Sequence, residues 1–170
     1  LAALTTGQIR GLTASGLGAL TTAQVSSLTT DQMGALASAQ LGGLGSAQVA
    51  ALTTEQLAQI NSSALAGLTT AGIRGLTTAQ VEALTTEQVS RLTATALGAL
   101  GTAQVVALTT AQVAALTTTQ LAGLASSQMR AMETADLAAL TTAQLRALNA
   151  GAVGALTTAQ IEALTTDQAG

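Results

Sequence analysis

Hydroxyl and carboxyl groups are the candidate chemical groups of this 170-residue sequence, because it contains neither histidine nor cysteine. A serine or threonine acts as a nucleophile only beside a base. Calcium needs six to eight oxygen atoms at one point, whereas the acidic residues here are single and widely spaced, and the nearest group, Glu133 and Asp136, has the spacing of a helix cap. We therefore expect no enzyme activity and no catalytic, cofactor-binding or metal-binding residues.

Pairs of threonines recur every eight residues and could form ranks of hydroxyl groups, as an ice-binding surface would require. The first threonine of each pair stands three residues before a glutamine, as Thr5 stands before Gln8. This is the spacing of a capping box, in which the two residues bond each other's backbone amides at a helix start. We prefer the capping interpretation. Amide ladders between neighbouring coils are a second use for the glutamines, but capping already accounts for them.

The composition excludes several classes of protein. The chain is 48% hydrophobic and 8% charged, with a net charge of −3, which is the reverse of a disordered composition. Five scattered arginines and no aromatic residue argue against nucleic-acid binding. Threonine and glutamine interrupt every apolar run, so we expect no membrane span, and no charged segment precedes an apolar one as in a signal peptide. No external partner is indicated.

The sequence is an eight-residue repeat with the consensus Leu-Thr-Thr-Ala-Gln-Val-Ala-Ala, whose positions we call columns one to eight. Leucine occupies column one at every eighth position from Leu4 to Leu164, with Ile60 and Met132 as the two replacements, which gives about 21 octads without insertion or deletion. Column six is always Val, Leu, Ile or Met until Ala169, and column eight is mostly Ala, Gly or Ser.

Each octad is predicted to form its own short helix. In one continuous helix the leucines would rotate by about 80° per octad and form no apolar seam. In a strand, columns one and six would point to opposite faces. Asn61 and Asn149 supply a cap where threonine is absent. Weaker helix boundaries are expected where column two offers no acceptor, which is the case at Ala37, Gly45, Gly101 and Ala125.

The charged residues support a helix polarity that restarts in each octad, because a helix dipole favours acids in its first turn and bases in its last. Acids occupy the second helical position (Asp31, Glu55, Glu87 and Asp167), the cap (Glu133) or the third position (Asp136). All arginines fall in columns seven and eight, at Arg10, Arg74, Arg91, Arg130 and Arg146. Glu82 and Glu162 are the exceptions.

The predicted fold is an all-α solenoid, a superhelical coil of very short helices with one helix per octad. Columns one and six, including Met33, Met129 and Met132, should lie inside. The small residues of columns seven and eight should let neighbouring coils approach closely, while columns three and four and most charges face solvent. Two to four octads per turn are compatible with the sequence. Residues 1–170 form a single array whose partners are its own neighbouring repeats, and the array is expected to be part of a longer one.

Runs such as residues 107–116, Ala-Leu-Thr-Thr-Ala-Gln-Val-Ala-Ala-Leu, resemble the octapeptide tracts of very large bacterial secreted or surface proteins of the adhesin and RTX-associated kind. The calcium-binding Gly-Asp nonapeptides of RTX tracts are absent. The resemblance implies an extracellular or cell-surface structural spacer. Residues 52–57 also resemble the helix start of TAL-effector repeats, whose longer period and DNA-reading loop are missing. The alternative function is a surface-binding module, either for ice or for a protein partner on the solenoid face.

Overall fold

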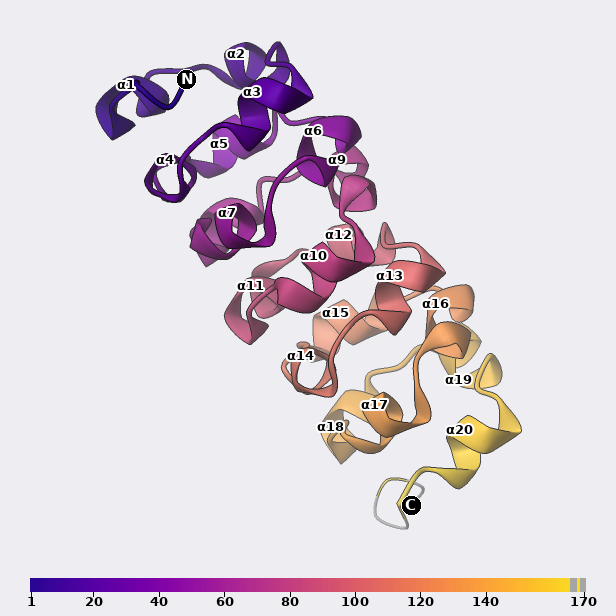
Figure 1. The fold of residues 1–170 in the computed structure, drawn as a ribbon. Helices are drawn as coiled ribbons and strands as arrows, with labels where there is room; N and C mark the ends of the chain where they lie inside the picture. The colour runs from indigo at the N-terminus through magenta and orange to yellow at the C-terminus, as the bar shows by residue number, and fades with distance from the viewer. Residues whose placement is uncertain (166–167, 169–170) are drawn as a thin grey trace.

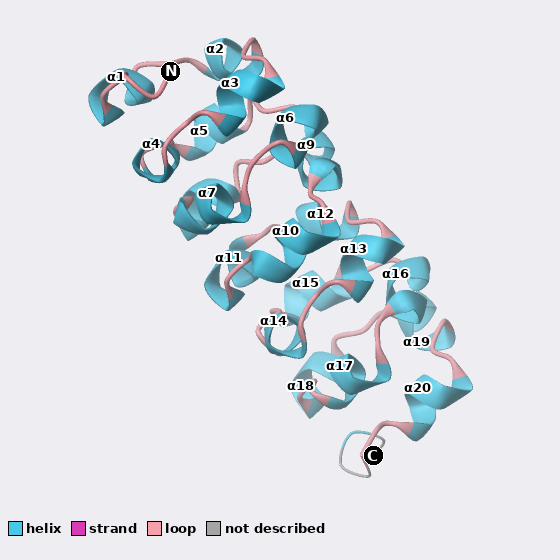
Figure 2. Cartoon of the chain, in the orientation of Figure 1, coloured by secondary structure: helices cyan, strands magenta, loops and turns pink. Residues whose placement is uncertain are grey.

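The computed structural model describes residues 1–165 and residue 168, and within them it contains twenty short α-helices and no strand (Figures 1 and 2). The helices are α1 (Thr6–Arg10), α2 (Ala14–Gly18), α3 (Thr22–Ser26), α4 (Thr30–Gly34), α5 (Ser38–Leu41), α6 (Ser46–Ala50), α7 (Thr54–Gln59), α8 (Ser62–Leu65), α9 (Thr70–Gly75), α10 (Thr78–Ala83), α11 (Thr86–Arg91), α12 (Ala94–Gly98), α13 (Thr102–Val106), α14 (Thr110–Ala114), α15 (Thr118–Ala122), α16 (Ser126–Ala131), α17 (Thr134–Ala138), α18 (Thr142–Arg146), α19 (Ala150–Gly154) and α20 (Thr158–Glu162). The prediction of one helix per octad is confirmed for the first twenty octads. The last octad lies partly outside the described residues.

The capping box explains why each helix begins where it does, as α14 illustrates. Thr109 has an extended backbone, and its hydroxyl accepts a hydrogen bond from the Gln112 amide at 3.3 Å. The Gln112 side-chain oxygen accepts the Thr109 amide in return at 2.8 Å. Asn149 caps α19 in place of threonine, as predicted, by accepting the Ala152 amide at 2.8 Å. These bonds satisfy amides that a helix cannot pair internally.

Helices without a column-two side-chain acceptor start in the same column as the others. Ala37 makes no side-chain cap bond, yet α5 begins directly after it. The Gln40 oxygen still accepts the Ala37 amide at 2.9 Å, so half of the capping box remains. The expected weakening therefore does not displace the helix start.

The predicted sorting of charges is confirmed for the described residues. All five arginines lie in the last turns of their helices, and Asp31, Glu55, Glu87 and Asp136 lie in first turns. The pKa of Glu55 is lowered because its carboxylate accepts hydrogen bonds from its own backbone amide and from the Thr53 hydroxyl. Asp167 lies outside the described residues.

Successive helices wind into a rod-shaped superhelix with three octads per turn. Each helix packs against the third helix along the chain, so that α4 contacts α7, α6 contacts α9 and α13 contacts α16. Three octads of eight residues make a coil of 24 residues. Helices α1 and α20 lie at opposite ends of the rod (Figure 1). The structure thus selects three from the two to four octads per turn that the sequence allowed.

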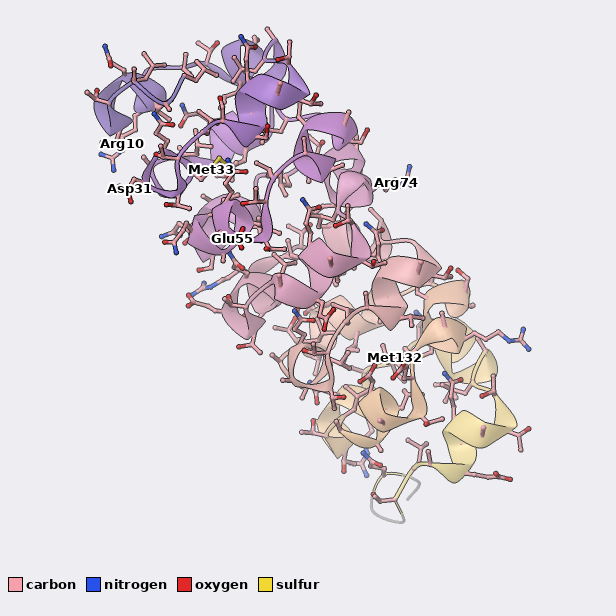
Figure 3. The ribbon with its side chains drawn as sticks, viewed as in Figure 1. Arg10, Asp31, Met33, Glu55, Arg74 and Met132 are labelled. Carbon is pink, nitrogen blue, oxygen red and sulfur yellow. The ribbon has the colours of Figure 1, made fainter. Side chains whose placement is uncertain are left out.

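Columns one and six form one apolar core along the rod, as predicted. Column six is completely buried in the middle of the chain, for example at Val105 and Val113, and the column-one Leu108 beside them is also buried. The side chains of Met33, Met129 and Met132 belong to this core (Figure 3 labels Met33 and Met132). All described column-four residues are exposed. No described helix has both the length and the apolar character that a membrane crossing requires.

Glycines in column eight lie directly over the previous coil. A Cβ atom on Gly67 would overlap the carbonyl group of Ser38, and one on Gly43 would overlap that of Ala14. In column seven, a Cβ on Gly18 would come within 2.7 Å of the Gly43 carbonyl oxygen in the next coil. These close approaches confirm that small residues in columns seven and eight set the spacing between coils.

Gly67→Ala is expected to lower the free energy of unfolding by about 1 to 3 kcal/mol, because the added methyl group must push two coils apart. Gly67 does not have a positive φ, so the effect is steric and not conformational. Gly154→Ala is the matched control, since nothing lies within 4 Å of its added Cβ. Urea unfolding followed by circular dichroism measures both variants. Equal stability of the two would show that the coils are not in tight contact at Gly67.

Candidate functional site

The corners between coils hold the most elaborate polar arrangement of the described chain, and Gln112 shows its geometry. The Gln112 oxygen is bound to the cap amide of its own helix at 2.8 Å. Its side-chain nitrogen, Nε2, donates to the carbonyl oxygens of Leu84 at 2.6 Å, Val81 at 2.9 Å and Glu82 at 3.2 Å. These carbonyls lie at the end of α10, where a helix leaves its last carbonyls unpaired. One buried amide therefore starts one helix and caps another in the preceding coil.

The bond from Nε2 to a column-one carbonyl is made by every described column-five glutamine that has a coil before it. In each case Nε2 donates to the carbonyl oxygen of the column-one residue 28 positions earlier. The donors are Gln32, Gln40, Gln48, Gln56, Gln80, Gln88, Gln104, Gln112, Gln120, Gln128, Gln144, Gln160 and Gln168. Gln8 and Gln24 are not among these donors, because the sequence has no residue 28 positions before them.

Capping was therefore an incomplete interpretation of the glutamine column. A capping box uses the amide oxygen and leaves the NH2 group, which carries two donors, without an assigned partner. A buried donor must find an acceptor. This requirement is the signal in the sequence that could have identified the contact between coils.

Asp136 replaces glutamine in the column-five position of α17 and is buried. Its Oδ1 accepts a hydrogen bond from the Thr110 hydroxyl at 2.8 Å, whereas Oδ2 is buried without a hydrogen-bond partner. Burial is the main cause of a raised pKa for this carboxyl, and the negative charge of Glu133 raises it further; the Thr110 hydroxyl and the Glu133 backbone amide oppose the shift. An ionised carboxylate has no proton to donate to the carbonyls that a glutamine would bind.

Glu133 and Asp136 do not form the complete cap that their spacing predicted. Glu133 occupies the cap position of α17 but makes no side-chain cap bond. The Asp136 carboxyl interacts with the Glu133 backbone amide and also accepts a hydrogen bond from the Thr110 hydroxyl of the preceding coil. Within residues 1–165 and 168, no group of three or more acidic side chains is placed to hold a metal ion.

Asp136→Gln is expected to raise the free energy of unfolding near neutral pH by about 1 to 3 kcal/mol, because the amide supplies the missing donor and removes a buried charge. The folded-state pKa of Asp136 is raised above its ordinary value of 3.8. Its contribution to stability is therefore fully present below that value and is lost as the pH rises through the raised pKa. The gain from the substitution should accordingly grow with pH across this window.

Urea unfolding of both proteins between acidic and neutral pH measures this dependence. Asp31→Asn is the control, because Asp31 is an exposed acid of a first helical turn. A gain that did not change with pH would show that Asp136 does not titrate in the folded state as described.

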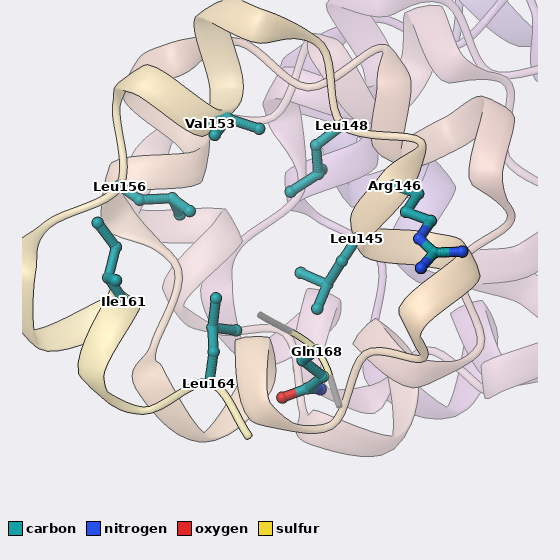
Figure 4. A pocket seen from close by; sticks show the side chains of 8 residues that line it. All are labelled: Leu145, Arg146, Leu148, Val153, Leu156, Ile161, Leu164 and Gln168. Atoms are coloured by element: carbon teal, nitrogen blue, oxygen red, sulfur yellow. The ribbon is translucent and has the colours of Figure 1, made fainter. Parts of the chain in front are cut away.

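An apolar cavity of about 420 Å³ opens at the C-terminal end of the rod (Figure 4). The cavity is lined by column-six and column-one side chains of the last coil, with a charged and a polar residue at its edge. These residues are Leu145, Val153, Ile161, Leu148, Leu156, Leu164, Arg146 and Gln168. The wall of the cavity is made of the same aliphatic side chains as the core, because columns one and six fill the axis everywhere else in the rod.

The fold and its corners define a repeat protein of the all-α solenoid class. A family profile described as the ALTTAQ repeat matches residues 1–30, 28–62, 57–94, 95–131 and 129–166. These segments cover nearly the whole sequence, and the chain belongs to the ALTTAQ repeat family. No curated protein matches the chain.

The six letters of the family's description can be followed in the structure at residues 107–112. Ala107 occupies the small column eight, Leu108 the core and Thr109 the cap. Gln112 joins two coils, while the intervening Thr110 and Ala111 are exposed. Four of the six positions are thus accounted for, Thr109 by the helix cap within its own octad and the other three by the core and the packing of one coil on the next.

Proposed function

We propose that this chain is a structural spacer in a large exported bacterial protein, and that it performs no catalysis. The observation that carries the proposal is the repeated coil-to-coil bond of the glutamine column, illustrated by Gln112 and Leu84. Each coil is held by the coil before it, so length increases with the number of octads while the cross-section stays the same. A rod of adjustable length is what a spacer requires.

An extracellular or cell-surface location and a bacterial, adhesin-like parent are the parts of the proposal that follow from the resemblance of residues 107–116 to octapeptide tracts. Antibodies raised against the array should label intact cells that produce the parent protein. Labelling only after permeabilisation would contradict this part of the proposal and leave the spacer role intact.

The outer surface favours a spacer over a surface-binding module. Column-three residues of every third octad follow one another along the rod in three ranks, one on each side of the coil. One rank is broken (Thr22, Ser46, Thr70, Ala94 and Thr118), and another keeps threonine over five coils (Thr6, Thr30, Thr54, Thr78 and Thr102). An ice-binding surface needs the same hydroxyl in neighbouring ranks of every coil, whereas here a single rank has it. We therefore expect thermal hysteresis at the level of a protein that does not bind ice.

The spacer role is tested by measuring distance against the number of coils. The chain has no cysteine, so Ala23→Cys and Ala159→Cys, both at exposed positions, can carry a pair of fluorophores for energy transfer. Deletion of residues 76–99 removes one coil of three octads, and deletion of residues 76–123 removes two. The separation should shorten by equal steps. Unchanged or irregular separations would refute the spacer proposal.

A further inference from the structure

Asp136 is the one buried acid of the described chain, and half of its carboxyl group has no hydrogen-bond partner. The residue is only 2% exposed, and its buried Oδ2 accepts no hydrogen bond. The Thr110 hydroxyl and the Glu133 backbone amide act on the same carboxyl, but neither carries a full positive charge. Buried charges in proteins are paired with an opposite charge or bind a metal ion. The carboxylate of Asp136 therefore lacks a positive partner.

The position of Asp136 in the repeat places it opposite a group of backbone carbonyls. In the other coils, carbonyls at these positions accept hydrogen bonds from a glutamine nitrogen, and Gln112 binds those 31, 30 and 28 residues earlier. The same spacings from Asp136 lead to Val105, Val106 and Leu108. Helix α17, which carries Asp136, packs on α14 directly after this corner. Oxygen atoms thus face the carboxylate where the other octads place a donor.

The carbonyls of this corner favour a positive charge. Val105 and Val106 are the last two residues of α13, and the carbonyls at the end of a helix carry a partial negative charge that attracts cations. Helix C-terminal ends and unwound carbonyls are also the groups that coordinate sodium in transporters. An aspartate side chain is one methylene shorter than glutamine and reaches less far toward these carbonyls, so an ion can bridge the two.

We propose that the corner between α13 and α14, beneath α17, binds a sodium ion between the Asp136 carboxylate and the carbonyl oxygens of Val105 and Leu108. The Thr110 hydroxyl gives its proton to Oδ1 and keeps lone pairs with which its oxygen can join the ligands. A single positive charge balances the single buried carboxylate, whereas calcium needs six to eight oxygens. Glu133 adds a second negative charge next to this carboxyl.

This site departs from the expectation that no residue of the chain binds a metal ion. That expectation counted side chains, and Asp136 and Glu133 are too few to hold calcium. Backbone carbonyls are present in every residue, so the residue types do not reveal them as ligands. Their convergence appears only when the coils are stacked.

Thermal unfolding in sodium chloride, compared with tetramethylammonium chloride at the same concentration, tests the proposal. Tetramethylammonium supplies the same ionic strength but is too large to fit among buried oxygens. At neutral pH the Tm should be about 2 to 4 °C higher in sodium, because an ion that binds only the folded chain stabilises it. Equal Tm values in the two salts would overturn the proposal.

Asp136→Asn removes the charge with little change in size, and its Tm should be the same in both salts. Asp136→Gln, which restores the bond of the other octads, should be equally insensitive. Asp31→Asn is the matched control, because it removes an exposed acid of a first helical turn and should keep the wild-type difference. A wild-type difference in Asp136→Asn would assign the ion to another part of the chain and overturn the proposal.

Two further measurements locate the ion at Asp136. The difference between the salts should vanish below pH 3.8, the ordinary pKa of this carboxyl, because the protonated group is neutral and donates to a carbonyl itself. Hydrogen exchange of amides in α17 and at the end of α13 should be slower in sodium for the wild type and unchanged for Asp136→Asn. A difference that persists at low pH, or slower exchange confined to other coils, would overturn the proposal.

Discussion

Gln112→Glu is expected to lower the free energy of unfolding by about 3 to 5 kcal/mol at neutral pH, although it exchanges only an NH2 group for an oxygen. The buried nitrogen of Gln112 donates to the carbonyls of Val81, Glu82 and Leu84. A carboxylate in its place would set a negative charge against three carbonyl oxygens and leave them without a donor. The substitution keeps the oxygen that accepts the Thr109 amide, so the helix start is preserved.

Lowering the pH should restore part of the loss, because the protonated carboxyl can again donate to a carbonyl. The pKa of the introduced group is raised in the folded state by its burial, so stability is highest at low pH and falls as the pH rises through that pKa. Gln8→Glu is the control, since Gln8 is exposed in the first coil. Urea unfolding measures both. Similar losses in the free energy of unfolding for the two variants would show that the contact between coils adds no stability beyond that of the helix cap.

Local chemistry was sufficient to predict where most described helices begin, whereas the starts after Ala37, Gly45, Gly101 and Ala125, which make no side-chain cap bond, follow from the eight-residue period. The threonine and glutamine of a capping box lie three residues apart, as Thr109 and Gln112 do, and their bonds depend on no distant part of the chain. The distribution of arginines over last helical turns follows from the helix dipole in the same way. The core columns could also be predicted, because a five-residue helix has few positions that can face inward.

The number of octads per turn could not be predicted. It depends on the angle between successive helices at each corner, and the residues of a single octad do not specify this angle. The corner is alike in both α10 and α14: the column-one amide donates to the column-six carbonyl three residues earlier, as Leu84 does to Val81 at 3.2 Å and Leu116 does to Val113 at 3.1 Å. A bond within one octad does not determine how many octads close a turn. Contact between helices three octads apart fixes the turn, and this contact is non-local.

The buried position of Asp136 escaped sequence analysis for a related reason. Its spacing from Glu133 matches a cap, and nothing within the octad shows that column five faces the preceding coil. Thr110, its partner, lies 26 residues away. The irregular octads can therefore be interpreted only when the coil period of 24 residues is known.

Deletion of residues 84–87, half an octad, is expected to break the array, with a loss on the order of 5 kcal/mol and unfolding in two steps instead of one. Deletion of residues 84–91, a whole octad, should leave one cooperative transition at only slightly lower stability. The longer deletion is the milder one, because it preserves the phase of every later octad with every earlier one.

The glutamine spacing explains this difference. After removal of the whole octad, the residue 28 positions before Gln104 is Leu68, a column-one leucine whose carbonyl replaces that of Leu76. After removal of half an octad, that residue is Gly72, which lies inside α9 and presents no corner. Thermal unfolding followed by circular dichroism, together with hydrogen exchange on both sides of the deletion, measures the outcome. A single sharp transition for the half-octad deletion would mean that the coils do not depend on this register.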